Sequence, residues 1–367
     1  MILVFDPVVL GASHVPFNSA LLSILCKAYP QDSVIMCAVA SHTTLLKRAP
    51  GLDRVVFRSF PEDWRENFRE ELPRLIRELN PTNVVLCGCS ASKLSIVRKV
   101  ARRQSNVSFD CVTHGELAEP AGWHSRNPWH RRNDFFGIVG RGFSSNVRFV
   151  VLEHAIVDKL RQIAPRRQLV SALPHPLSCL GEGTAHEQAD KHRRAVISFV
   201  GGTFRSKGFA TFVECARRFG ETFDFRVIGA RAHEYDPALD DLFTVPPSVE
   251  KLERDVFEAA LLETDVICLP LDPVRYSWSA SGTLLDAIAL DIQLLTMRTA
   301  VTRDWETRYG EFGLLADNET SMIEQLEAIR SGMQPWALTD DQRRSREKIK
   351  KERAVDRLAC TFSLLNR

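Results

Sequence analysis

Short apolar runs alternate with helical patterns along the chain, and this alternation limits the choice of fold more than any other feature of the sequence. Apolar runs bounded by turn residues predict buried strands, and strands that alternate with helices predict parallel sheets covered by helices. In the first half, strands are predicted at residues 2–5, 33–38, 54–57, 83–87, 108–112 and 149–152, with a long helix at 62–79. We therefore expect a doubly wound α/β domain.

The pattern stops at residues 177–194, where glycines and charged residues interrupt the apolar periodicity, and then resumes. In the second half, the predicted strands are 195–200, 224–228, 266–270 and 293–296, and the predicted helices are 208–218, 249–262 and 282–289. This series predicts a second doubly wound domain.

A chain of 367 residues is long enough for two such domains. We expect an N-terminal Rossmann-like domain at 1–178, a linker at 179–194 and a second Rossmann-like domain at 195–338. The remaining segment, 339–367, is expected to form one charged helix over 340–365 that returns to the first domain.

The composition is that of an ordinary globular protein, with 44% hydrophobic and 26% charged residues. The nine cysteines are odd in number and lie mostly in apolar runs, which favours reduced thiols and a cytoplasmic location. No apolar run reaches the roughly 18 residues that a membrane-spanning helix needs.

The net charge of +2 conceals an uneven distribution. Residues 1–180 contain 23 Lys and Arg against 15 Asp and Glu, whereas the rest of the chain has an excess of acidic residues. The first half is therefore expected to face an anionic partner, although an uneven scatter of solvated charges is the alternative. Residues 122–136 mix Trp with Arg, a composition suited to peripheral contact with an anionic membrane, and the alternative is an ordinary loop that covers the domain. No nucleic-acid-binding motif accompanies them.

A glycine-rich turn between a predicted strand and a predicted helix is suited to a diphosphate. Here Gly202 and Thr203 are followed by two cations, Arg205 and Lys207. Glycines let the backbone approach phosphate oxygens, and the cations and the helix N-terminus neutralise their charge. The turn matches neither a Walker A nor a dinucleotide-binding motif, and the alternative is an ordinary turn with solvated side chains.

A second anion site is predicted where the helix at 282–289 begins. Ser281, Gly282 and Thr283 place backbone amides and hydroxyls at this helix start. Asp286, one turn further on, is a candidate acceptor for the hydroxyls of a ribose. The alternatives are helix capping by Ser281 and a favourable dipole interaction for Asp286.

These segments resemble the donor domain of GT-B glycosyltransferases, most of all family 4 and related bacterial exopolysaccharide enzymes. The resemblance rests on residues 199–208, 228–230, 265–270, 281–287 and 313–317. The N-terminal half resembles the acceptor domain through residues 112–116 and 173–177. The resemblance implies two Rossmann-like domains that face each other across a cleft.

The resemblance also assigns donor-binding roles. Lys207 matches the lysine that binds the donor diphosphate, and Arg205 is expected to replace a family arginine whose position falls on Gly202. Asp286 matches the second acid of the E-x7-E motif, which holds the ribose, whereas the first acid falls on Trp278 and is lost. The nucleobase of the donor is expected beside Gly229 and Ala230, facing residues 245–247.

On the acceptor side, His14 and Asn18 follow the first predicted strand, and His114 and Glu116 follow the fifth. The carboxyl ends of parallel strands are where such sheets bind ligands. His114 is the first candidate to position or deprotonate an acceptor hydroxyl, and Glu116 is the rival base. No Asp-x-Asp motif indicates a metal-bridged diphosphate, so no metal or other cofactor is expected.

The sequence thus predicts a metal-independent glycosyltransferase of the hexosyltransferase type. It would move a sugar from a nucleotide-diphosphate sugar to a hydroxyl of a glycan or lipid-linked oligosaccharide, in bacterial exopolysaccharide or cell-surface glycan synthesis. Charge develops on the departing diphosphate, which Lys207, Arg205 and helix N-termini are placed to stabilise. The alternatives are a catalytically silent GT-B subunit that binds a glycan or partner, and a GT-B sugar-nucleotide epimerase.

Overall fold

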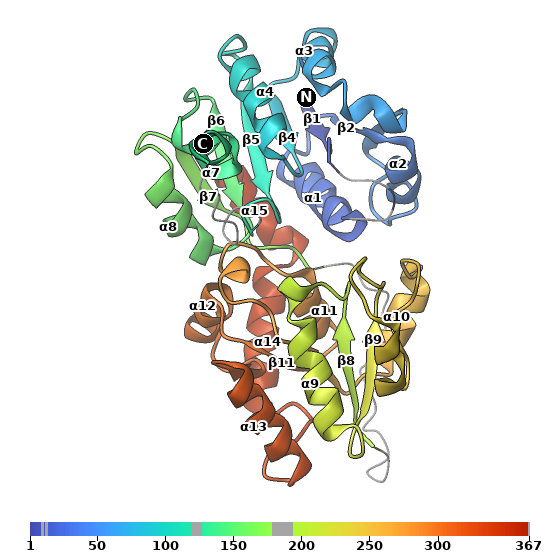
Figure 1. The fold of residues 1–367 in the computed structure, drawn as a ribbon. Helices are drawn as coiled ribbons and strands as arrows, with labels where there is room; N and C mark the ends of the chain where they lie inside the picture. The colour runs from blue at the N-terminus through green and yellow to red at the C-terminus, as the bar shows by residue number, and fades with distance from the viewer. Residues whose placement is uncertain (9–10, 12–13, 119–126, 178–193, 366–367) are drawn as a thin grey trace. The chain divides into compact units, whose positions relative to one another are not determined.

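The chain forms two compact units (Figure 1). The computed structural model describes residues 1–8, 11, 14–118, 127–177 and 194–365. Unit 1 consists of Met1–Leu177, Ser277–Ala280 and Glu352–Arg367, and unit 2 of Ser178–Tyr276 and Ser281–Lys351. Apart from Arg194, the predicted linker at 179–194 lies outside the described residues.

Unit 1 contains a seven-stranded parallel sheet with the order β3-β2-β1-β4-β5-β6-β7. The strands are β1 (Ile2–Phe5), β2 (Val34–Val39), β3 (Val55–Phe60), β4 (Asn83–Leu86), β5 (Ser108–Thr113), β6 (Val147–Val151) and β7 (Leu169–Ala172). Ile2 of β1 pairs with both Val34 and Asn83, so the strand order reverses between β1 and β4. The carboxyl ends of the strands at such a reversal are the usual ligand site of an open α/β sheet.

The helical segments of unit 1 connect these strands, except for α15, which follows the last strand of the chain. They are α1 (Val15–Ala28), α2 (Ala40–Leu46), η1 (Glu62–Arg65), α3 (Phe68–Leu79), α4 (Ala91–Ala101), α6 (Pro128–Asn133), α7 (Phe135–Gly140), α8 (His154–Ile163) and α15 (Val355–Leu365). The single helix predicted at 62–79 is wrong: η1 and α3 are separate, and Trp64 of η1 is buried and stacks on Phe5 and Phe60.

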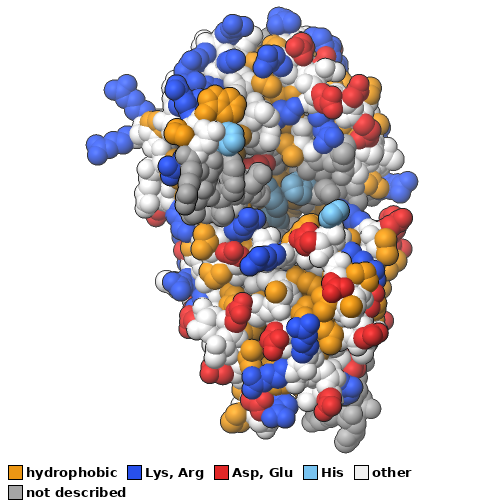
Figure 2. Space-filling view, viewed as in Figure 1, with side chains coloured by type: hydrophobic (Ala, Val, Ile, Leu, Met, Phe, Trp, Pro, Cys, Tyr) orange, Lys and Arg blue, Asp and Glu red, His pale blue; other side chains and the backbone are white. Residues whose placement is uncertain are grey.

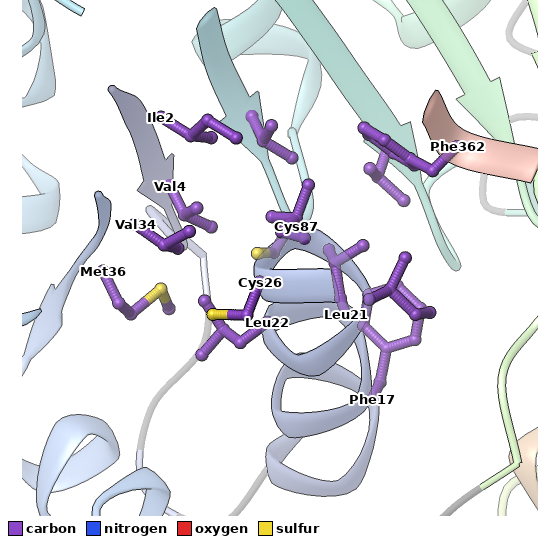
Figure 3. Packing of buried hydrophobic residues seen from close by; sticks show 14 of the residues in the cluster. Ile2, Val4, Phe17, Leu21, Leu22, Cys26, Val34, Met36, Cys87 and Phe362 are labelled. Atoms are coloured by element: carbon purple, nitrogen blue, oxygen red, sulfur yellow. The ribbon is translucent and has the colours of Figure 1, made fainter. Parts of the chain in front are cut away.

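The core of unit 1 joins the two ends of the chain. Phe17, Leu21 and Leu22 of α1 face the strands, and Phe362 of α15 belongs to the same buried cluster (Figure 3). All four side chains are at most 4% exposed, and burial of each such side chain stabilises the fold by about 1.5–3 kcal/mol. The eight cysteines among the described residues form no disulfide.

Unit 2 contains a five-stranded parallel sheet with the order β12-β11-β10-β8-β9. Its strands are β8 (Val196–Val200), β9 (Asp224–Ile228), β10 (Val266–Leu269), β11 (Gln293–Met297) and β12 (Leu314–Ala316). Its helices are η2 (Arg205–Lys207), α9 (Phe209–Phe219), η3 (Pro237–Leu242), α10 (Arg254–Leu262), η4 (Arg275–Ser277), α11 (Gly282–Ala289), α12 (Ala300–Tyr309), α13 (Glu319–Arg330) and α14 (Asp340–Glu352). The strand order here reverses between β8 and β10, so two doubly wound sheets are confirmed.

The single C-terminal helix predicted over 340–365 is wrong, because α14 and α15 are separate helices. Arg346 of α14 is fully buried and donates to the carbonyl oxygens of Ala287, Ile292 and Phe312 in unit 2. Arg353, between the two helices, is 1% exposed and donates to Oε2 of Glu153 in unit 1 at 2.9 Å. The helix therefore ends where a buried ion pair fixes the arginine.

Candidate functional site

The loop after β8 folds its lysine back over the end of that strand. Gly201 and Gly208 have φ angles of +109° and +76°. A Cβ atom on Gly201 would collide with Nζ of Lys207, and a Cβ on Gly208 would overlap the carbonyl group of Pro270, which follows β10. Glycine is therefore required at both positions for its backbone angle, and at Gly208 also for the close approach of the Pro270 backbone.

The Lys207 ammonium group consequently lies at the point where the strand order of unit 2 reverses. The amide of Asp272 donates to the carbonyl oxygen of Ser206 at 3.2 Å, which fastens this loop to the loop after β10. Burial lowers the pKa of Lys207, and the nearby carboxylate of Asp286 acts in the opposite direction. The two residues that were assigned to diphosphate and ribose thus influence each other electrostatically.

The other residues of the glycine-rich turn differ in their surroundings. Arg205 is exposed, and Gly202 lies against the ring of Phe204, which is itself 50% exposed. Thr203 is buried, and its hydroxyl accepts a hydrogen bond from the amide of Ala232 at 2.8 Å, which joins the loops after β8 and β9. The roles of Gly202, Thr203 and Arg205 at a diphosphate stay predictions.

The start of α11 supplies a second group of candidate residues. Ser281 precedes the helix without capping it through its side chain. A Cβ atom on Gly282 would have open space around it, within the part of the chain that is described. Thr283 is half-buried in the first turn, and Asp286, one turn into the helix, is 7% exposed. The phosphate roles of the first three residues stay predictions, as does the ribose role of Asp286.

Trp278, where the family resemblance places an acid, packs within unit 1. Its ring centroid lies 4.8 Å from that of Phe136, and Nζ of Lys159 lies 5.3 Å from its ring centroid. Next to it, Ser279 donates from its hydroxyl to the carbonyl oxygen of His114 at 3.3 Å. In this chain the position therefore provides an aromatic packing residue.

The predicted nucleobase residues follow β9. Gly229 accepts a hydrogen bond from the amide of Ser248 at 2.9 Å, and Ala230 accepts one from the amide of Thr203 at 3.2 Å. A Cβ on Gly229 would collide with the backbone of Gly201. These contacts place the two residues beside the glycine-rich turn, and their contact with a base stays a prediction.

In unit 1, three histidines from different loops lie together at the carboxyl ends of the strands. His14 precedes α1, His114 follows β5, and His175 comes after β7. The ring centroids of His14 and His114 are 4.4 Å apart, and those of His114 and His175 are 5.2 Å apart. Phe17 packs its ring against both His114 and His175, at 5.0 and 5.2 Å.

Glu116 fixes the backbone around His114. Its Oε2 accepts the amide hydrogen of His114, and its Oε1 accepts that of Cys89, both at 2.6 Å. Burial raises the pKa of Glu116, whereas these amide hydrogen bonds act to lower it. Both carboxylate oxygens thus support the ends of two strands, and the role of Glu116 as a rival base stays a prediction.

The His114 and His175 side chains are neutral at neutral pH. Burial lowers the pKa of His175 to about 4. Burial, reinforced by repulsion from His14 and His175, holds the pKa of His114 well below its usual range. A neutral imidazole is the form that accepts a proton from a hydroxyl group.

Asn18, the other predicted acceptor-side residue, belongs to a buried network. Its Nδ2 donates to Oδ2 of Asp6 at 2.7 Å and to Nε2 of His42 at 2.8 Å. His42 then donates through Nδ1 to the carbonyl oxygen of Gly11 at 2.8 Å. This network fixes the described part of the loop after β1, and an acceptor contact of Asn18 stays a prediction.

Helix α6 carries the aromatic and cationic side chains that were predicted to meet a membrane. None of its residues is buried; Trp129 is 69% exposed, and Arg131 and Arg132 are exposed beside it. Lys and Arg side chains are also spread over the face of unit 1 seen in Figure 2. Residues 122–126 of the predicted segment lie outside the described residues. None of the helices described here combines the length and hydropathy needed to cross a bilayer.

Comparison with known proteins identifies the fold. No protein-family model and no curated protein sequence matches the chain. Solved structures match over nearly its whole length. Anabaena HepE with UDP and glucose has 11% identity and a TM-score of 0.70, with 99% of this chain and 98% of that chain covered. The apo form of the lipopolysaccharide outer core galactosyltransferase WaaB has 12% identity and a TM-score of 0.67, with 100% and 98% covered. This chain has the GT-B fold.

WaaG, a glycosyltransferase involved in lipopolysaccharide biosynthesis, is a further GT-B structure that matches, with 12% identity, a TM-score of 0.64, and 99% of this chain and 98% of that chain covered. The resemblance inferred from the sequence is therefore confirmed for the fold. Within this GT-B chain, Lys207 and Asp286 lie near each other in unit 2, and His14 and His114 lie in contact in unit 1. Sequence reasoning did not select His175 as a site residue. The signal that would have found it is its position just after β7, a strand that was not predicted.

Proposed function

We propose that this protein is a glycosyltransferase that uses a UDP-sugar as donor and a hydroxyl group of a glycan as acceptor. The observation that carries the proposal is the Lys207 ammonium group, held over Gly201 at the carboxyl end of β8 and near Asp286. Such a group is suited to the negative charge that develops on a departing diphosphate. HepE binds UDP and UDP-glucose on the same fold, which supports uracil as the base.

Unit 2 is proposed to bind the donor. Lys207 and the amides at the start of α11 would contact the diphosphate, with Arg205 as a second cation and Asp286 at the ribose. Since these groups supply positive charge themselves, we propose that transfer needs no divalent cation. Unit 1 is proposed to bind the acceptor, with His114 as the base that takes the proton of its hydroxyl group.

The first experiment is calorimetric titration of the full chain with UDP, GDP, ADP and dTDP and their sugars. We expect selective binding of uridine nucleotides, weakened about 10- to 100-fold in Lys207→Ala, the range expected for loss of a charged hydrogen bond. Asp286→Asn is expected to weaken the binding of nucleosides and of nucleotides to a similar extent. Arg303→Ala and Asp241→Asn, exposed positions in the same unit, are the matched controls and are expected to bind like the wild type.

A second assay follows release of UDP from UDP-hexoses, with and without glycan acceptors and in the presence of EDTA. Turnover that survives EDTA and yields a lengthened glycan supports the proposal. Binding without any turnover would instead favour a silent GT-B subunit, for which the replacement of a family acid by Trp278 is the supporting observation. Release of an altered free sugar nucleotide would favour an epimerase.

The acceptor is proposed to be a lipid-linked glycan of exopolysaccharide or cell-surface synthesis, at the cytoplasmic face of a membrane. Exposed Trp and Arg side chains on α6 have the chemistry that binds anionic lipid surfaces. We expect sedimentation with phosphatidylglycerol-containing vesicles but not with pure phosphatidylcholine. Changing Arg131 and Arg132 to Gln should reduce binding, whereas the matched change of exposed Arg166 and Arg167 should not. Equal loss in both variants would contradict docking through α6.

A further inference from the structure

His175 makes one hydrogen bond that fixes where its proton lies. Its Nδ1 is 2.8 Å from the carbonyl oxygen of Pro176, its own chain neighbour. A carbonyl oxygen only accepts hydrogen bonds, so Nδ1 of His175 must carry the hydrogen. The ring is buried, at 3% exposed, and neutral at pH 7, so its Nε2 has no hydrogen and can only accept.

The acceptor nitrogen of His175 faces His114. The two Nε2 atoms are 3.2 Å apart, within hydrogen-bond distance. Since Nε2 of His175 carries no hydrogen, Nε2 of His114 must donate. In neutral His114 the hydrogen on Nε2 leaves Nδ1 without one. The chain of bonds from Pro176 through His175 therefore sets the tautomer of His114.

The remaining contacts of His114 fix its orientation. Its amide donates to Glu116, and its carbonyl oxygen accepts from Ser279. His14 stacks on its ring and Phe17 packs edge-on against it. The backbone hydrogen bonds and the packing of His14 and Phe17 therefore hold the ring of His114 in place, and its Nε2 is hydrogen-bonded to His175.

We propose that His175 is a positioning residue, which holds His114 in the tautomer whose unprotonated Nδ1 is the base for the acceptor hydroxyl group. This inference rests on the proposed function. In the reaction the acceptor O–H bond breaks and its proton forms an N–H bond on Nδ1, while the acceptor oxygen bonds to the anomeric carbon and the nucleotide diphosphate leaves with the bonding electrons. His175 keeps its own proton and accepts from Nε2 throughout, so it steadies the cationic ring of His114.

The tautomers can be read without substrate. Two-bond ¹H–¹⁵N correlation spectra of the full chain, labelled with [¹⁵N]histidine, distinguish hydrogen on Nδ1 from hydrogen on Nε2. His114→Gln and His175→Gln identify the two sets of signals by their loss. At pH 7 we expect hydrogen on Nδ1 of His175 and on Nε2 of His114. Any other pair of protonation states overturns the proposal.

Kinetics of two His175 variants separate positioning from packing. His175→Leu removes the acceptor but keeps an apolar filling, and should lower kcat about 10- to 100-fold with unchanged UDP affinity, a sizeable part of what a general base contributes. His175→Gln offers a side-chain oxygen to Nε2 of His114 and should restore most of kcat. Exposed His233→Leu is the control and should behave like the wild type.

Equal losses in the Leu and Gln variants, or no loss in the Leu variant, would overturn the role of His175. Thermal unfolding of each variant shows whether a loss reflects unfolding, and His175→Gln remains informative if the Leu variant fails to fold. An inactive wild type with the expected spectrum refutes the proposed function. An active wild type with the other tautomers refutes this inference alone.

Discussion

The two units have the same type of sheet, but the chemical groups at the carboxyl ends of their strands differ. In unit 2 a glycine-rich loop brings a lysine back over the end of β8. In unit 1 the corresponding region holds stacked histidines, two of them neutral, and a carboxylate that accepts two backbone amides. In such sheets the fold decides where a ligand binds, whereas the loop residues decide which chemical groups it meets.

The difference also concerns what holds each region in place. The loop of unit 2 depends on backbone groups that approach closely because no side chain intervenes. The region in unit 1 depends on side chains that hydrogen-bond one another and the backbone. Glycine substitutions should therefore affect unit 2 most, and changes of protonation should affect unit 1 most.

The largest expected effect is that of Gly208→Ala. A Cβ here overlaps the Pro270 carbonyl group and demands a positive φ, so we expect a loss of about 4 kcal/mol in the free energy of unfolding. Gly282→Ala, whose Cβ has open space among the described residues, is the matched control and should be close to neutral. Urea denaturation measures both. Equal stabilities of the two variants would contradict the tight loop packing.

The next effect is the loss of stability of unit 1 when the pH is lowered. The unfolded chain protonates His175 near pH 6.5, but the folded chain does so only near pH 4. The contribution of His175 to the free energy of unfolding is therefore fully present above pH 6.5. It is lost as the pH falls toward 4, which lowers the free energy of unfolding by about 3 kcal/mol. His175→Gln should lose this part of the pH dependence, while His114 contributes in the same direction in both proteins. Denaturation curves over this pH range test it, and parallel curves would count against a buried neutral His175.

The smallest of the three effects is that of Glu116→Gln. The amide group replaces one acceptor oxygen by a donor, so one of the two charge-assisted bonds to Cys89 and His114 is lost, at a cost of about 2 kcal/mol. Glu70→Gln, at an exposed position of α3, is the control. Thermal unfolding measures the difference. A variant of unchanged stability that loses all turnover would reverse the assignment and make Glu116 the base.

Much of the architecture could be predicted because it is encoded in local sequence. Residues 2–5, 224–228 and 282–289 were predicted with the boundaries that β1, β9 and α11 have, since apolar runs and turn residues define them. The strand β7 was missed because its burial is uneven: Leu169 is exposed and only Val170 is fully buried. Missing β7 also removed the reason to place His175 at the carboxyl edge of the sheet.

The division between α14 and α15 could not be read from the sequence either. Neither glycine nor proline marks Arg353 or Ala354, and the charged pattern continues through them. The break accompanies the buried bond from Arg353 to Glu153, a partner 200 positions earlier in the chain. Similarly, the tautomer of His114 depends on Pro176, on another strand end, and follows from tertiary contacts alone.

The core of unit 1 has a consequence for how the protein is made. Leu358, Ala359 and Phe362 of α15 complete the cluster that α1 and the first strands begin. Domains usually fold in order as they are synthesised, N-terminal domain first. Here the N-terminal unit cannot finish its core until α15 has left the ribosome. A chain that stalls before Val355 leaves the apolar face of α1 uncovered, and a fragment cut after Leu177 inherits the same defect.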